Sequence, residues 1–78
     1  MDTRDFTREL AARKGISEQT AYRYINTVMD TNRLILADGK EIEIGSFGKF
    51  TVVTEMNGSK SVVFRAAKSL NRAIGGGE

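Results

Sequence analysis

Neither cysteine nor histidine occurs in the 78 residues of this chain. Disulfide bonds and ordinary zinc sites are therefore excluded. A domain of this size buries only about 60% of the surface that its unfolded chain exposes, so its core is marginal on its own. Because small domains without such crosslinks often gain stability by oligomerisation, we expect the chain to fold with a partner chain, an identical one in the simplest case.

The N-terminal segment has the pattern of a short amphipathic helix over residues 3–14. Phe6, Leu10 and Ala11 form a narrow apolar stripe at helical spacing. Asp2 is placed to cap the first turn, and Gly15 is placed just past the end, where a glycine adopts positive φ without strain.

A longer helix is predicted over residues 18–37, with Ser17 as its N-cap. Its apolar stripe, which includes Ile25, Met29 and Leu36, is too wide for one short neighbour to cover. We therefore expect this helix to pack both on the first helix and on another chain. Asn32 interrupts the stripe.

The rest of the chain predicts three strands and a short helix. Residues 41–44 alternate strictly between Glu and Ile, as in a half-buried strand, and a second strand follows from Phe50. Asn57-Gly58 is a strong hairpin signal that should pair the second strand with a third over residues 61–64. A final helix over residues 66–74 completes an α+β fold. Residues 1–74 are expected to form a single domain, and residues 75–78 a flexible tail.

The charge distribution points to an anionic partner. The net charge is only +2, but residues 60–72 carry four basic side chains and no acidic one. Such a cluster suits phosphate contacts, and a merely solvated surface is the alternative. No apolar run has the length of a membrane span, and the charged N-terminal segment does not resemble a signal peptide, so we expect an intracellular protein without a membrane partner.

No group of residues suggests catalysis. Glu41 and Glu43 share one strand face and are interpreted as a polar face that discourages edge pairing. No nucleophile has an adjacent base in the sequence. We therefore expect neither an enzyme nor a cofactor, metal or small-molecule substrate.

The stretch KGISEQTAYRYI, residues 14–25, leaves a regulatory alternative open. It has the look of a helix-turn-helix, in which Gln19, Thr20 and Arg23 would read bases in a major groove. A helix, a glycine and a capping serine also recur in many helical hairpins, so the match has low specificity.

Two segments carry a family resemblance. Ser46-Phe47-Gly48-Lys49-Phe50 resembles the Gly-Phe-Gly-x-Phe motif of the bacterial HU and integration host factor group of architectural DNA-binding proteins, with Ser46 in place of the first glycine. Phe64-Arg65-Ala66-Ala67-Lys68-Ser69-Leu70 resembles the segment that opens the last helix of that family, with Ala67 in place of a glycine. We expect Gly48 to supply the turn conformation.

The resemblance implies an intertwined homodimer in the nucleoid of the cytoplasm. Its two N-terminal helices would form the dimer base and would not enter a groove. Residues assigned on this basis to the dimer core are Phe47, Phe50, Phe64, Ile25, Met29 and Leu36.

The family's long β-ribbon arm is expected to be truncated in this chain. In the family, that arm reaches into the minor groove, and a proline at its tip wedges between base steps. Here the chain reverses at Asn57-Gly58, and the sequence contains no proline. Bending driven by such a wedge is therefore not expected.

Without the arm, we expect the dimer to bind duplex DNA through its body. Binding should be weak and salt-sensitive, with little sequence preference and little bending. The basic side chains assigned to phosphate contact are Lys68, Arg65, Arg72, Arg4, Lys60 and Lys49. Arg65, Lys68 and Arg72 are expected on one helix face, and the amides near Ala67 and Lys68 at a helix N-terminus. The alternative is a protein-interaction module that dimerises with, or antagonises, a full-length relative.

Overall fold

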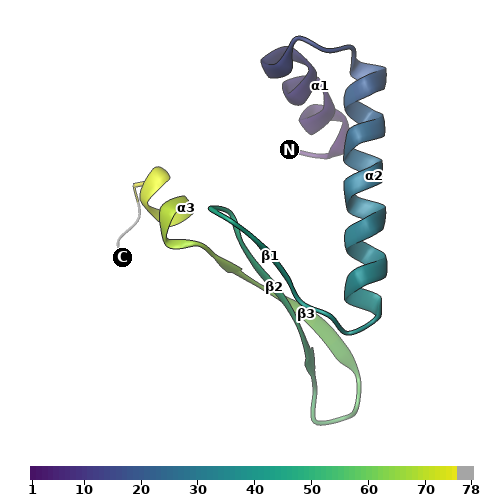
Figure 1. Cartoon of the computed structure of the whole chain (residues 1–78), viewed down its shortest axis with the longest axis vertical. Coiled ribbons are helices and arrows are strands. Elements are labelled where there is room, and N and C mark those ends of the chain that lie inside the picture. Colours follow the sequence, from purple (N-terminus) through teal and green to yellow (C-terminus); the bar gives the residue numbers. More distant parts are fainter. Residues whose placement is uncertain (76–78) are drawn as a thin grey trace. The chain divides into compact units, whose positions relative to one another are not determined.

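The computed structural model describes residues 1–75, which form two compact units. The first unit comprises Met1–Thr31 and the second begins at Asn32, so each is described by itself. The expected flexible tail lies, apart from Gly75, outside the described residues. The order of elements is two helices, three strands and a short helix (Figure 1), which confirms the predicted α+β class.

The first unit is a helical hairpin whose caps are those predicted. In α1 (Thr3–Lys14), the Asp2 carboxylate accepts a hydrogen bond from the Asp5 amide at 2.9 Å, and Gly15 ends the helix with φ of 65°. In α2 (Glu18–Ala37), the Thr20 amide donates to Ser17 Oγ at 3.0 Å. Figure 1 shows α1 beside the N-terminal half of α2, where Ala21 is 0% exposed.

The second unit contains an antiparallel sheet in the order β1-β2-β3. Its strands are β1 (Ile42–Ile44), β2 (Gly48–Thr54) and β3 (Lys60–Ala66). Ile42 lies opposite Phe50, and Phe50 lies opposite Phe64. The topology is a simple meander, and β2 and β3 form the hairpin that Asn57-Gly58 predicted.

The β2–β3 hairpin is short, and its two strands pair along their whole length. Each strand has seven residues. The turn is held by hydrogen bonds from the Glu55 amide to the Ser59 carbonyl at 2.7 Å and from the Gly58 amide to the Glu55 carbonyl at 3.0 Å. Gly58 adopts φ of 89°, a conformation that favours glycine.

The C-terminal helix is shorter than the sequence predicted. α3 spans Lys68–Ala73, because Ala66 still pairs with Gly48 in the sheet and Ala67 is the extended N-cap residue. Ser69 Oγ donates to the Ser46 carbonyl at 3.0 Å, which ties the helix to the turn before β2. Ile74, the C-cap residue of α3, is 74% exposed.

Among residues 1–75, no helix combines the length and the apolar character that crossing a membrane requires.

Candidate nucleic-acid interface and subunit contact surface

The sheet has one apolar face and one charged face. Because side chains alternate along a strand, the register places Phe50 and Val52 of β2 on the same face as Val62 and Phe64 of β3. Ile42 of β1 joins them. A sheet face made of apolar side chains is typical of a surface that contacts another chain and not of the outer surface of an isolated domain.

Three phenylalanines form a cluster in this unit. The ring of Phe64 lies 5.3 Å from that of Phe47 and 4.8 Å from that of Phe50, in tilted arrangements that favour aromatic contact. Phe47 and Phe64 remain 48% and 41% exposed. The structure thus brings together the three aromatic residues assigned to the dimer core and leaves Phe47 and Phe64 about half uncovered in a single chain.

Gly48 has a different role from the one expected. It lies within β2, opposite Ala66, and its φ is not positive. A Cβ atom there would lie 2.6 Å from the Phe64 ring and from the Arg65 carbonyl oxygen. Glycine is needed at this position because of the close approach of β3, and not for a turn conformation.

The opposite sheet face carries Lys49 and Arg65, which are directly paired in the register. Lys49 Nζ lies 3.6 Å from Glu41 Oε2, and Glu43 is opposite Lys49 on β1. The two basic residues therefore share their surface with two carboxylates. The carboxylate of Glu41 partly neutralises the charge of Lys49.

The structure separates the basic residues that the sequence grouped on one helix face. Arg65 belongs to β3, so it does not share a helix face with Lys68 and Arg72, which are four residues apart on α3. The amides near Ala67 and Lys68 lie at the start of α3, as expected, but the Ala67 amide donates to the Phe47 carbonyl at 2.9 Å.

Lys60 lies away from the other basic strand residues. It pairs with Thr54 at the turn end of the hairpin, whereas Lys49 and Arg65 pair near the opposite end. Lys49 and Lys60, both assigned to phosphate contact, therefore lie at opposite ends of the hairpin.

Arg4 lines an open groove between α1 and α2 in the first unit. The same groove is lined by Glu18, Gln19 and Tyr22. Glu18 therefore supplies an acidic group at the surface to which Arg4 was assigned. Thr20, one of the candidate base-reading residues, is engaged at the N-cap of α2, where Ser17 Oγ donates to Thr20 Oγ1 at 2.9 Å.

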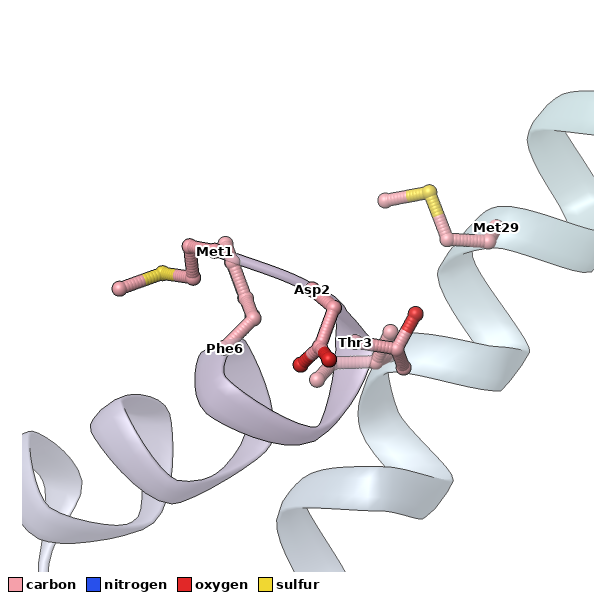
Figure 2. A pocket seen from close by; sticks show the side chains of 6 residues that line it. Met1, Asp2, Thr3, Phe6 and Met29 are labelled. Atoms are coloured by element: carbon pink, nitrogen blue, oxygen red, sulfur yellow. The ribbon is translucent and has the colours of Figure 1, made fainter.

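A second groove in the first unit is mostly apolar. Figure 2 shows Met1 and Phe6 of the N-terminal region and Met29 of α2 around it, and Ile25 also lines it. Met29 is 56% exposed. Ile25 and Met29 were assigned to the dimer core, whereas the contribution of Met1 was not foreseen because it precedes the periodic part of the helix. Leu36, the remaining residue of that assignment, is partly buried in the second unit.

The sequence matches a family profile described as bacterial DNA-binding protein over residues 1–57. The chain belongs to this family. Members are architectural DNA-binding proteins of the HU type that form dimers and associate with the nucleoid, and they are not enzymes. Comparison with curated protein sequences gives no match.

Solved HU structures share the fold. The chain resembles the HU mutant V42I from Thermotoga maritima with a TM-score of 0.84 and 24% identity, covering 95% of this chain and 99% of that chain. HU from Thermotoga maritima gives a TM-score of 0.81 and 23% identity, with 95% and 98% covered. The order of helices and strands described above is therefore that of the HU fold.

Proposed function

We propose that this protein is a homodimer that binds duplex DNA weakly through phosphate contacts of its body, with little sequence preference and little bending. Residues 1–74 would act as its single domain, in the nucleoid of the cytoplasm. The observation that carries the proposal is the short β2–β3 hairpin within an HU-type fold.

The hairpin offers little with which to bend DNA. Minor-groove proteins of the architectural type insert apolar wedges between base steps and wrap the bent duplex around additional surface. Here the strands reverse after seven residues each, and Glu55 at the turn accepts a hydrogen bond from Ser61 Oγ at 2.8 Å. A carboxylate at that place opposes close approach to phosphates, so we attribute binding to the body.

The uncovered apolar surface supports the homodimer. The phenylalanine cluster is half exposed, and the groove that contains Met29 is apolar and open. Contiguous apolar patches of this kind mark interaction sites in soluble proteins. A second copy of the chain would cover both, in keeping with the dimers that the family forms.

Lys68 and Arg72 are the best-placed candidates for phosphate contact. They lie four residues apart on α3, and Lys68 has no ion-pair partner among residues 1–75. Arg65 precedes them on β3. Four to six phosphate contacts per dimer would give a slope of roughly −4 to −5 in log affinity against log salt, and micromolar affinity at best in physiological salt.

A second candidate function has one observation in its favour. Lys49 is paired with Glu41, and Arg4 and Glu18 line the same groove, so two of the six assigned basic residues share their surface with an acidic group. A body whose positive charge is partly offset in this way would suit a chain that dimerises with a full-length relative and weakens its binding to DNA.

The test is fluorescence anisotropy of a labelled duplex of about 30 base pairs over a series of salt concentrations. Lys68→Glu is compared with Arg23→Glu, which makes the same change of charge on α2. We expect saturable, salt-sensitive binding that collapses with Lys68→Glu and largely survives Arg23→Glu. The reverse order, with preference for one short sequence, would support the helix-turn-helix alternative. Absence of binding at low salt would leave the interaction module.

A further inference from the structure

Asn32 is the polar residue at the centre of an otherwise apolar stripe on α2. Its neighbours on the same helix face, three and four residues away in both directions, are Val28, Met29, Ile35 and Leu36. All four are apolar. A side-chain amide in this position is unfavourable both for helix propensity and for packing against an apolar neighbour.

The amide of Asn32 has no hydrogen-bond partner within the described part of the chain. The residue is partly buried, and none of the side-chain hydrogen bonds or ion pairs formed among residues 1–75 involves it. Thr31, beside it, bonds back to the Thr27 carbonyl at 2.8 Å, which shows how a polar side chain on this helix is otherwise satisfied. The amide of Asn32 is therefore available to bond to another chain.

Apolar side chains one turn before Asn32 on α2 are exposed in the single chain. α1 lies beside the N-terminal half of α2, where Ala21 is fully buried (Figure 1). Val28 and Met29, one turn before Asn32, are about half exposed at 49% and 56%. In the homodimer proposed above, this uncovered part of the stripe belongs to the subunit interface.

We propose that the Asn32 side chains of two copies hydrogen-bond to each other across the twofold axis, and that this pair selects identical chains as partners. The inference rests on the proposed homodimer. A primary amide carries both an acceptor and donors, so it is complementary to a second copy of itself. In an isologous interface, a residue near the axis faces its own copy. A relative with an apolar side chain there would leave one buried amide unsatisfied, which is costly.

The proposal is tested by mixing full chains and counting dimers. ¹⁵N-labelled wild type and an unlabelled variant are unfolded together, refolded and analysed by native mass spectrometry. If chains pair independently, homodimers and heterodimer form in the statistical ratio. A mixture of labelled and unlabelled wild type measures this reference ratio. Three variants are used: Asn32→Leu, Asn32→Asp and, as the matched control on another face of α2, Asn26→Leu.

The two substitutions at Asn32 should shift the heterodimer in opposite directions. With Asn32→Leu, one amide faces a leucine only in the heterodimer, so we expect that species at least about fivefold below the statistical amount. With Asn32→Asp, two carboxylates repel in the homodimer while an amide can donate to a carboxylate in the heterodimer, so the heterodimer should exceed it. Asn26→Leu should follow the statistical ratio.

A statistical amount of heterodimer for both Asn32 variants would overturn the proposal. It would mean that each Asn32 makes its contacts separately, so that the loss per chain is additive and favours no pairing. The proposal would also be overturned if the amount of heterodimer departed from the statistical ratio in the same direction for both variants. Failure of the homodimer itself is a separate result, since wild type alone would then remain monomeric in the same spectra.

Discussion

Gly48 lies directly against the ring of Phe64, one strand away. A Cβ atom at Gly48 would approach two Phe64 ring carbons and the Arg65 carbonyl oxygen to 2.6 Å. Phe64 in turn contacts Phe47 and Phe50, so the missing side chain creates the space in which the phenylalanine cluster forms. One glycine thereby sets the shape of the proposed subunit surface.

Gly48→Ala should destabilise the protein by about 1–3 kcal/mol, the usual cost of overpacking. The methyl group meets backbone as well as the ring, so a change of the Phe64 rotamer alone cannot relieve the contact. Urea unfolding followed by circular dichroism at one fixed chain concentration measures the difference. Gly45→Ala is the control, because a Cβ at Gly45 meets nothing within 4 Å and should cost far less. Equal effects of the two substitutions would contradict this account of Gly48.

Phe64→Ala should weaken the dimer strongly. In a single chain, Phe64 is 41% exposed, and its truncation would have a modest effect if that surface stayed open. If a second copy covers it, the loss approaches the 3–5 kcal/mol typical of a buried phenylalanine. Sedimentation equilibrium measures the dissociation constant of the variant and of wild type.

The control for this prediction is Val63→Ala, on the opposite face of β3. Val63 has a similar exposed fraction, 47%, in the single chain. We expect its substitution to leave the dimer dissociation constant nearly unchanged. A dissociation constant for Phe64→Ala close to that for Val63→Ala would remove the apolar sheet face from the interface.

The bounds of α1 and the start of α2 could be predicted because their end signals are local. Asp2 and Ser17 accept hydrogen bonds from amides three residues later, and Gly15 adopts the left-handed conformation that ends α1. The hairpin was predictable for the same reason, since Asn57-Gly58 determines where the chain reverses. Such signals depend on a few neighbouring residues and need no knowledge of the tertiary structure.

The candidate site was harder to predict because its residues are positioned by strand register. Helical spacing placed Arg65 with Lys68, but pairing of Ala66 with Gly48 keeps this segment in the sheet. The Ala67 amide, expected among the amides that open the last helix, donates to the carbonyl of Phe47, a residue twenty positions earlier in the sequence. Contacts of this range override local propensity, and a single sequence does not reveal them.

Ser17→Ala should cost about 1 kcal/mol of stability, the typical value for loss of an N-cap. The substitution removes the acceptor of the Thr20 amide at the start of α2. Ser17→Asn keeps a good N-cap and should restore most of the loss. Urea unfolding at one chain concentration compares the three proteins. Loss of stability in both variants to the same extent would show that the Ser17 hydroxyl has another role.

Glu41→Gln should increase the affinity for duplex DNA. The substitution removes the carboxylate that lies 3.6 Å from Lys49 Nζ and releases this ammonium group for a phosphate. Each new phosphate contact should steepen the salt slope by about 0.9, and an exposed ion pair of this kind accounts for up to about fivefold in affinity. Glu43→Gln makes the same change of charge two residues later, in β1, but breaks no ion pair formed within residues 1–75. Anisotropy titrations over a salt series should therefore show a steeper slope for Glu41→Gln than for Glu43→Gln. Identical slopes would mean that Lys49 does not contact phosphate, and that only net charge changed.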